Sequence, residues 1–385
     1  MSQTIPFTFH RPDLALSYCD SLEGKGLLDS RSGLFLAAPR RTGKSTFLRE
    51  DLLPAMSKRG WTTIYIDLWA DKSKDPALLI ANAIKSRIGE FAGVIAKLAK
   101  AAGVEKVNVF GALSLSLDVF GLPQELTLSD ALEALTIAAK SPIALIVDEA
   151  QHALSTPPGI NAMFALKAAR DHLNQGTAEQ RLFLVLTGSN RDKLTHLVLK
   201  RSQPFFGAQV TRFPLLDKEF TDTYADYVNR LLAPDNQFEK NDMFEAFKLV
   251  GHRPEMLRSI VGEIALDSGA SGLGEQLKNG AEELKERIWG AMESEFAALT
   301  DIQRTVLETI IKYGNQYVPF SETSMKAYAE LSNQGKVSIP AVQAALDALR
   351  EKNLVWRAAY GDYALEDDSL VMWYKYRPSS RHGEK

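Results

Sequence analysis

The residues best suited to chemistry stand in the segment PRRTGKST at residues 39–46. Gly43, Lys44 and Ser45 form the end of the phosphate-binding pattern G-x-x-x-x-G-K-[ST]. In such a loop the backbone N–H groups and a helix N-terminus hold phosphates, the lysine reaches the β- and γ-phosphates, and the hydroxyl binds Mg²⁺. The residues that we expect to line this site are Pro39, Arg40, Arg41, Thr42, Gly43, Lys44, Ser45 and Thr46.

The loop departs from the pattern at its first position, where Ala38 replaces glycine. A methyl group there costs on the order of 1 kcal/mol if φ is positive and nothing if it is not. A G-K-[ST] triplet arises by accident roughly once in a couple of thousand residues, so the triplet alone does not decide the matter. Its context favours a true site, because a buried-strand run precedes it and an amphipathic helix follows.

A pair of carboxylates supplies the second half of an NTPase site. Asp148 and Glu149 directly follow the apolar run of IALIVDEAQH, residues 143–152. Hydrolysis needs a carboxylate for Mg²⁺ and a group that activates water, both at a strand end beside the loop. We expect Asp148 to share the metal with Ser45 and Glu149 to polarise the attacking water. His152 is interpreted as a polar residue at a helix start rather than as a base.

A further strand, RLFLVLTGSN, ends in polar residues. Ser189 and Asn190 would there lie between the γ-phosphate and the carboxylates, where they sense the phosphate and position water. A plain strand-ending turn is the alternative. The catalytic candidates from the motifs are Lys44, Asp148, Glu149, Ser189 and Asn190.

The elements that position these residues follow an α/β pattern. Apolar runs that suit strands buried on both faces of a parallel sheet occur at residues 33–39, 62–69, 143–150, 181–189 and 209–215. Amphipathic helices are expected between them, for example over 44–56 and 76–102, with an inserted strand or hairpin at 107–121. The fold class is therefore a P-loop NTPase with a parallel sheet covered by helices.

After the sheet the pattern is helical. Helices at 220–234, 241–251 and 254–269 suggest a small lid, and the glycine- and serine-rich segment 268–276 is a linker or a surface loop. Three more helices (299–314, 321–333 and 338–353) and two strands around Gly361 and Asp362 predict a C-terminal winged-helix domain. The expected domains are an ATPase core (1–216), a helical lid (217–285) and a winged helix with a basic tail (286–385).

Composition narrows the class of protein. The net charge of -3 gives no global attraction to nucleic acid or to an anionic membrane. The one cysteine, Cys19, excludes an internal disulfide framework and fits a reducing compartment. There is no secretory signal and no run of about 18 apolar residues. We expect a cytoplasmic protein without a membrane partner.

The motifs PRRTGKST, VDEAQ, LTGSN and GHRPEML, in this order, resemble those of the archaeal-type P-loop ATPases of the STAND group, relatives of the AAA+ proteins. They cover about residues 5–265, and the winged helix extends the resemblance towards Trp373. The resemblance implies a Mg²⁺-dependent ATPase that forms a homo-oligomer. ATP rather than GTP is implied by the resemblance, and no guanine-reading N-K-x-D stretch is present.

The same resemblance implies three further nucleotide contacts. Arg11 and Pro12 correspond to a turn near the adenine, although the acidic residue expected after the arginine is missing. Arg253 corresponds to a lid arginine that reaches phosphate, with a solvent-facing side chain as the alternative. Arg201 is the candidate arginine finger for a neighbouring subunit, and Arg191 is the second candidate.

Two hypotheses remain open for the use of ATP. One is a switch acting on DNA, as in initiator or transposition-helper ATPases; the other is a signalling or assembly ATPase, for example in a defence module, whose winged helix binds an unidentified protein. The candidate recognition helix offers only Gln343, Arg350 and Lys352, opposed by Asp347 and Glu351. Further cations that could reach phosphates are Arg357, Lys375, Arg377, Arg381 and Lys385. A non-hydrolysing scaffold is a weaker third hypothesis, because Lys44 and Glu149 are both present.

Overall fold

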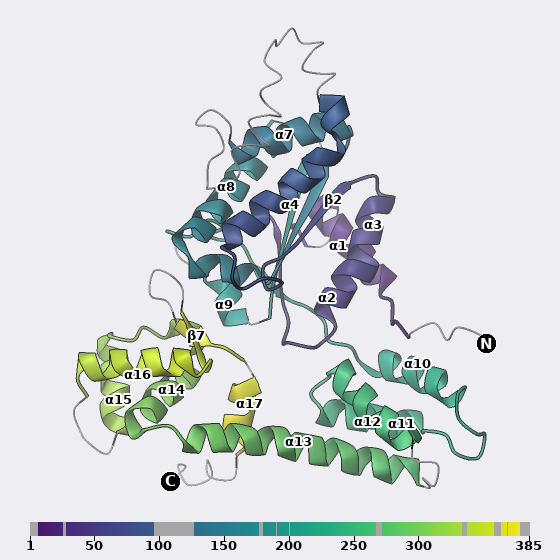
Figure 1. Cartoon of the computed structure of the whole chain (residues 1–385), viewed down its shortest axis with the longest axis vertical. Helices are drawn as coiled ribbons and strands as arrows, with labels where there is room; N and C mark the ends of the chain where they lie inside the picture. The colour runs from purple at the N-terminus through teal and green to yellow at the C-terminus, as the bar shows by residue number, and fades with distance from the viewer. Residues whose placement is uncertain are drawn as a thin grey trace.

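The computed structural model describes residues 7–25, 28–95, 127–176, 180–189, 191–199, 201–266, 272–332, 337–357, 363–367 and 369–377. Several expectations lie outside these residues: the hairpin at 107–121, Asn190, the turn at Gly361 and Asp362, residues 268–271 of the glycine-rich segment, and the tail from residue 378, with Arg381 and Lys385. In Figure 1 a sheet and its helices lie above two smaller groups, which the long helix α13 joins.

The sheet has five parallel strands in the order β2-β3-β4-β1-β5. Their bounds are Leu34–Ala37 (β1), Thr62–Asp67 (β2), Ile143–Asp148 (β3), Leu182–Gly188 (β4) and Val210–Arg212 (β5). The three central strands are buried throughout, whereas the edge strands β2 and β5 are partly exposed because each pairs on one side only. The predicted parallel sheet is confirmed, and its burial on both faces holds for the central strands.

Helices cover both faces of this sheet (Figure 1). One face packs against α4 (Pro76–Glu90), α7 (Leu128–Ala139), α8 (Pro157–Asn174) and the short α9 (Arg191–Thr195). The other face packs against α1 (Pro12–Leu22) and the helix that follows the loop. The carboxyl ends of β3, β4 and β1 are neighbours, which is where ligands bind in open α/β sheets.

The helix after the loop is less regular than expected. It is divided into α2 (Lys44–Phe47), a π-helical segment (Leu48–Leu52) and α3 (Leu53–Lys58). Pro54 has no N–H to donate to the carbonyl four residues earlier, and a wider turn accommodates that loss. The helix expected over 76–102 ends, as α4, at Glu90, and residues 96–102 lie outside the described chain.

The group that follows the sheet is helical. It contains α10 (Lys218–Asn229), α11 (Lys240–Leu249), α12 (Pro254–Leu266) and the first part of α13 (Leu273–Ala297). Phe220, Phe247 and Leu257 are at the centre of its separate core, and Phe7 from the N-terminus packs against it. No helix in the described ranges is long and apolar enough to span a membrane.

The C-terminal group has a third core. Its elements are α14 (Asp301–Tyr313), a 3₁₀ turn (Gly314–Gln316), α15 (Glu322–Leu331), α16 (Ile339–Glu351), the antiparallel pair β6 (Val355–Arg357) and β7 (Tyr363–Leu365), and α17 (Ser369–Tyr376). The last helix was not expected from the sequence. Its residue Trp373 is buried with Phe296 of α13, so this segment is part of the packed core rather than a free tail.

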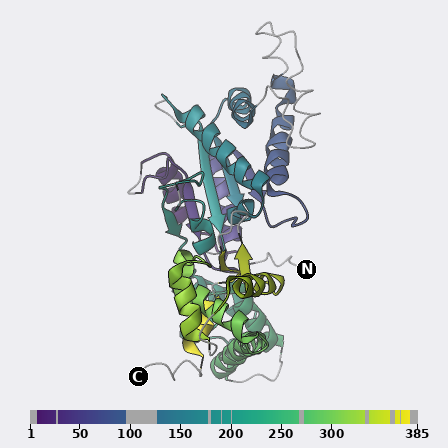
Figure 2. The same cartoon turned by 90° about the vertical axis from the view of Figure 1, so that its left-hand side faces the viewer.

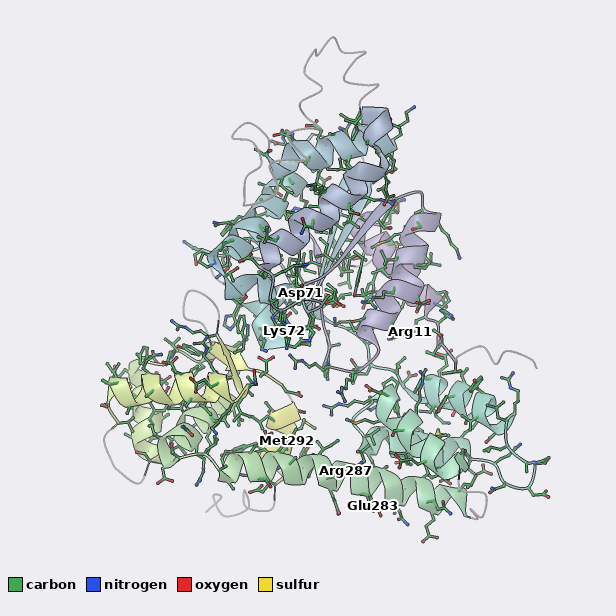
Figure 3. All side chains as sticks on the ribbon, viewed as in Figure 1. Arg11, Asp71, Lys72, Glu283, Arg287 and Met292 are labelled. Atoms are coloured by element: carbon green, nitrogen blue, oxygen red, sulfur yellow. The ribbon has the colours of Figure 1, made fainter. Side chains whose placement is uncertain are left out.

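Helix α13 belongs to two cores, and the expected boundary at residue 285 falls inside it. Leu277 and Ala281 pack with the lid helices, whereas Trp289 and Phe296 pack with the C-terminal group. Met292, labelled with Glu283 and Arg287 in Figure 3, also packs with that group.

The hairpin β6–β7 joins the C-terminal group to the sheet. Val355 and Leu365 point into the C-terminal core, while their neighbours Trp356 and Ala364 belong to the core beneath the sheet. This alternation follows from the two-residue period of a strand. Figure 2 shows the hairpin at the junction between the C-terminal group and the sheet with its helices. One face of the expected wing is therefore occupied by an intramolecular contact.

Candidate nucleotide-binding site

The loop between β1 and α2 has the backbone that a phosphate loop requires. Gly43 has φ 88°, a left-handed conformation that side chains disfavour. Arg41 also has a positive φ, of 65°, which is uncommon for a residue other than glycine. Ala38 is not among the described residues with positive φ, so its methyl group is accommodated without strain. Thr42 is buried and donates a hydrogen bond to the Pro39 carbonyl over 2.7 Å, which holds the loop closed.

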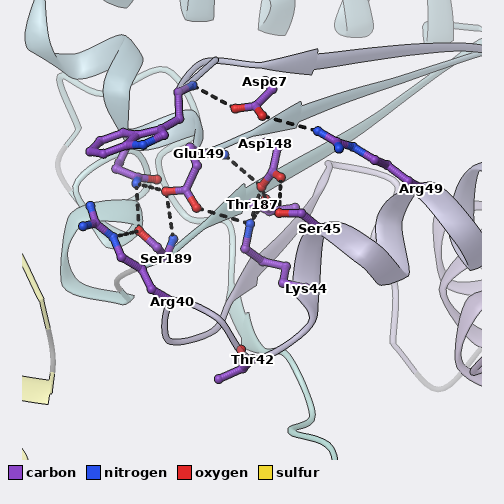
Figure 4. Close-up of polar contacts among 12 residues, drawn as sticks. Arg40, Thr42, Lys44, Ser45, Arg49, Asp67, Asp148, Glu149, Thr187 and Ser189 are labelled. Carbon is purple, nitrogen blue, oxygen red and sulfur yellow. Dashed lines mark hydrogen bonds and ion pairs between the residues drawn. The ribbon is translucent and has the colours of Figure 1, made fainter. Parts of the chain in front are cut away.

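Lys44, Ser45 and Asp148 meet at the centre of the site (Figure 4). Lys44 forms an ion pair with Asp148, and their side chains are 6% and 2% exposed. The Ser45 hydroxyl donates to Asp148 Oδ2 over 2.7 Å. Burial alone would raise the pKa of Asp148, but the charge of Lys44 and the hydrogen bonds to Asp148 outweigh it and lower the pKa to about 2. Asp148 is therefore ionised at neutral pH.

Two further groups hold this centre: Thr187, from the polar strand end that the sequence indicated, and Tyr65, which the sequence did not single out. Thr187, at the end of β4, accepts a hydrogen bond from Lys44 Nζ over 3.0 Å and donates to Asp148. Tyr65 of β2 donates its hydroxyl to Asp148 Oδ2 over 3.0 Å. Both are polar side chains near strand ends at the edge of the sheet where the loop lies, and that placement is the signal that identifies them.

Glu149 stands beside this centre with φ 56°, in the left-handed region. Gln151 Nε2 donates to Glu149 Oε2 over 2.6 Å, and the Ser189 N–H lies 3.3 Å from the same oxygen. Burial raises the pKa of Glu149, and the charge of Lys44, 3.4 Å away, outweighs it, so that the pKa is lowered. The ionised carboxylate is free to accept a proton, and a positive φ at a residue other than glycine is a backbone feature found at functional sites.

These side chains face a cavity of about 430 Å³, a size typical of small-molecule sites. Its lining residues are Pro39, Arg40, Arg41, Gly43, Lys44, Ser45, Thr46, Asp67, Trp69, Asp148 and Glu149. The structure thus brings together most of the predicted loop residues and both carboxylates. Asp67, the last residue of β2, and Trp69 just after the strand were missed, because no phosphate-loop pattern extends to that strand.

Comparisons with known proteins bear on the fold. No protein-family model and no curated protein matches the chain. Among solved structures, the chain is similar to a Walker-type ATPase of Pyrococcus abyssi, with 19% identity, a TM-score of 0.51 and 96% of each chain covered. It is also similar to the ADP form of the ORC2 protein of Aeropyrum pernix, with 16% identity, a TM-score of 0.50 and 97% of this chain and 95% of that chain covered. The chain has the fold of a P-loop ATPase.

The donor atoms of this ATPase fold suit Mg²⁺. The Ser45 hydroxyl and the Asp148 carboxylate are hard oxygen ligands, and they are already adjacent at 2.7 Å. In the part of the chain that the structure describes, no group of three or more His, Cys, Asp or Glu residues is placed to hold a metal ion. Mg²⁺ sites commonly combine one or two protein ligands with phosphate oxygens and water.

Three residues for which nucleotide contacts were predicted do not line this cavity. Arg11 stacks on Phe213 at 5.0 Å and donates to the Pro214 carbonyl over 2.8 Å, which fixes the N-terminal segment to the sheet (Figure 3). Pro12 is the first residue of α1. Arg253 lines a separate cavity of about 1200 Å³, which shares Pro39 with the first. Arg11, Pro12 and Arg253 thus lie outside the lining of the 430 Å³ cavity, and their contacts with the adenine and with phosphate stay predictions.

The remaining candidates vary. Arg201 is exposed in the turn after α9 and does not line the cavity, and its role as an arginine finger stays a prediction. Arg191 begins α9. His152 is inside the 3₁₀ segment Ala150–Ser155, where its half-buried ring packs on Trp69 at 4.3 Å. Burial lowers the pKa of His152 to about 4, so it is uncharged at neutral pH.

Proposed function

We propose that the chain is a Mg²⁺-dependent ATPase, related to the AAA+ and STAND proteins, that uses ATP binding and hydrolysis as a cytoplasmic switch. The observation that carries the proposal is the convergence of Lys44 and Ser45 from the loop on Asp148 and Glu149 from the neighbouring strand end. A lysine held by carboxylates, at the first turn of a helix, offers phosphate a cation, N–H groups and a metal site in one place.

The proposed roles follow from the geometry. Lys44 exchanges its contact with Asp148 for the β- and γ-phosphates, and Asp148 with Ser45 holds Mg²⁺, which neutralises the developing phosphate charge when bound. Glu149 accepts the proton of the attacking water. Ser189, whose N–H lies near Glu149, is close to that water. For Asn190, the next residue in the sequence, the proposed role is also to sense the γ-phosphate and to position water.

The decisive experiment measures ATP turnover for the wild type, Lys44→Ala and Glu149→Gln. We expect no measurable turnover for Lys44→Ala, because Lys44 is the cation that pairs with both Asp148 and Glu149 and that the β- and γ-phosphates would contact. Glu149→Gln should retain nucleotide binding and lose at least about 100-fold in turnover, the usual contribution of a general base. Turnover that survives Lys44→Ala would overturn the site assignment.

We further propose that the active form is a homo-oligomer, in which Arg201 of one subunit reaches the nucleotide of the next and Arg253 contacts phosphate after lid closure. Exposure of Arg201 supports this role. Arg201→Ala should lower turnover only at protein concentrations at which subunits associate. Equal turnover of Arg201→Ala and wild type at every concentration would disprove the finger.

We propose that the C-terminal group is a winged helix. DNA association, as in initiator ATPases, is the first candidate for its function. Specific contacts favour the second candidate, a signalling or assembly ATPase whose winged helix binds protein. In α16, Gln343 donates to Asp347 over 3.0 Å, and Arg350 lies 3.5 Å from the same carboxylate. Arg377, taken from sequence as part of a free tail, lies 3.3 Å from Glu308 and over the Tyr374 ring.

A binding assay distinguishes the two candidates. Salt-dependent binding of duplex DNA supports the first, and no binding at about 50 mM salt excludes it, since phosphate contacts are strongest at low salt. An ATP-dependent change in oligomeric state without DNA supports the second. A monomer in every nucleotide state would contradict the second candidate.

A further inference from the structure

One carboxylate of the C-terminal group reaches the phosphate loop. Glu366 stands in the connection between β7 and α17, where its N–H is bonded to the Leu354 carbonyl. Its Oε1 accepts a hydrogen bond from Arg40 of the loop over 2.6 Å, and its Oε2 accepts one from Lys193 of α9 over 2.7 Å. Lys193 also donates to the Glu366 carbonyl over 3.2 Å. A single residue therefore bridges the loop and the helix after β4.

The Arg40 side chain lies between Glu366 and the nucleotide cavity. Its guanidinium is 4.7 Å from the centre of the Trp69 ring, and both residues line the cavity. Its Nε is 3.5 Å from the Ser189 hydroxyl, at the end of β4 (Figure 4). Since Ser189 also contacts Glu149 through its N–H, Arg40 is on the side of the cavity where the attacking water and the γ-phosphate would be.

The two partners of Glu366 differ in solvent exposure. The Lys193 side chain is 0% exposed, whereas that of Arg40 is 32% exposed. Burial lowers the pKa of Lys193, and the charge of Glu366 opposes that effect. Separation of Lys193 from Glu366 would take an anionic partner from a fully buried cation, which is costly. Arg40 is therefore the partner that can leave while Glu366 stays in place.

A guanidinium binds carboxylate and phosphate by the same paired hydrogen bonds, so the two anions compete for it. A terminal γ-phosphate carries more charge than a carboxylate, and it would enter on the side of Arg40 that faces Ser189. The β-phosphate instead binds at the N–H groups around Gly43 and Lys44. ADP thus leaves Arg40 on Glu366, and ATP draws it away.

We propose that Arg40 is a ligand of the γ-phosphate and that Glu366 competes with this phosphate for it. The pair then discriminates ATP from ADP, and ATP weakens the contact between the C-terminal group and the loop. Linkage makes the effect reciprocal: loss of the Glu366 contact tightens the binding of ATP. The inference rests on the proposed function, because it assumes that the cavity binds nucleotide.

The test is a double-mutant cycle on nucleotide affinity, measured by calorimetry with ADP and with the non-hydrolysable analogue AMP-PNP. Glu366→Gln should raise the AMP-PNP affinity relative to that of ADP about tenfold, equivalent to about 1.4 kcal/mol. Arg40→Ala should weaken AMP-PNP and leave ADP unchanged. In the Arg40→Ala background, Glu366→Gln should have no further effect, because the competitor has lost the group that it competes for.

The chain offers a matched control. Arg41, the next loop residue, lies 3.7 Å from Glu255 of α12, and their side chains are 61% and 70% exposed. Glu255→Gln should leave the ratio of the two affinities unchanged, since exposed ion pairs are worth little. If Glu366→Gln unfolds the chain, Arg40→Gln leaves the contact of Glu366 with Lys193 in place and should still reduce the ratio.

The outcomes separate the two proposals. An affinity ratio that is unchanged in both Glu366→Gln and Arg40→Gln overturns the competition, as does an effect of Glu366→Gln that persists without Arg40. Absence of binding of either nucleotide to the folded wild type overturns the proposed function instead. An equal shift for ADP and AMP-PNP assigns Glu366 a structural role only and refutes the discrimination.

Discussion

Replacement of Lys44 by methionine should destabilise the protein even without nucleotide. Lys44→Met keeps most of the side-chain volume and removes the cation that pairs with the buried Asp148. Loss of one partner from a buried ion pair usually costs about 3–5 kcal/mol. Asp148 would still accept hydrogen bonds from Ser45 and Tyr65, so we expect the free energy of unfolding to fall by about 2–3 kcal/mol.

The measurement is urea denaturation at pH 7.5, followed by circular dichroism, with no nucleotide present. The matched control is the double variant Lys44→Met with Asp148→Asn, which removes both charges. It should recover at least half of the lost stability, because the buried Asp148 charge is no longer left without its cation.

The dependence of this loss on pH follows from the pKa of Asp148. In the wild type that pKa is lowered from 3.8 to about 2, so the stabilisation is present above pH 3.8 and is lost as the pH falls towards 2. Without Lys44, burial raises the pKa of Asp148, and protonation relieves the variant at higher pH. The difference between the two proteins should shrink from pH 7.5 to pH 4. A loss below about 0.5 kcal/mol at pH 7.5, or a double variant no more stable than the single one, would refute the reasoning.

Three further predictions concern neighbouring residues. The free energy of unfolding of the wild type, relative to that of His152→Asn, should fall by about 3 kcal/mol between pH 6.5 and pH 4. The reason is that the pKa of His152 is about 4 in the folded protein and 6.5 in the unfolded chain, so the unfolded chain binds the proton first; parallel pH profiles of the two proteins in urea denaturation would contradict this. Gly43→Ala should destabilise the protein by about 1 kcal/mol and weaken ADP binding, because φ is 88°, and equal melting temperatures would contradict the strain. Gly188→Ala should lower turnover more than ADP affinity, since its Cβ would lie 2.7 Å from Gln151 Oε1 and displace the amide that holds Glu149; an equal loss in both would place the defect in binding.

The grouping of polar side chains at the site could be predicted from the sequence. The apolar runs at 143–150 and 181–189 both end in polar residues, and the ends of neighbouring parallel strands meet at one edge of the sheet. Gly43, Lys44 and Asp148 could be assigned because their chemistry is local: a loop, a helix start and a strand end. The irregular turn before Pro54 is explained by the proline itself, but the periodicity of the apolar residues concealed it.

Other features depend on tertiary packing, which a linear pattern does not contain. Arg11 and Arg377 are cations that a sequence alone assigns to ligands, yet both stack on aromatic rings of their own chain. Thr187 contributes to the site through a neighbouring strand. The contact between Arg40 and Glu366 joins residues 326 positions apart, and no spacing rule extends so far.

Helix α13 is continuous over 25 residues, although its two halves belong to different cores. At 1.5 Å per residue it is about 37 Å long, and a regular helix resists bending over that length. It is therefore one stiff element that connects the lid helices with the C-terminal group. A tilt of about 10° at the lid would displace the far end by about 6 Å, a movement of roughly one helical turn. A small movement of the lid would in this way become a larger displacement at the other end of this helix.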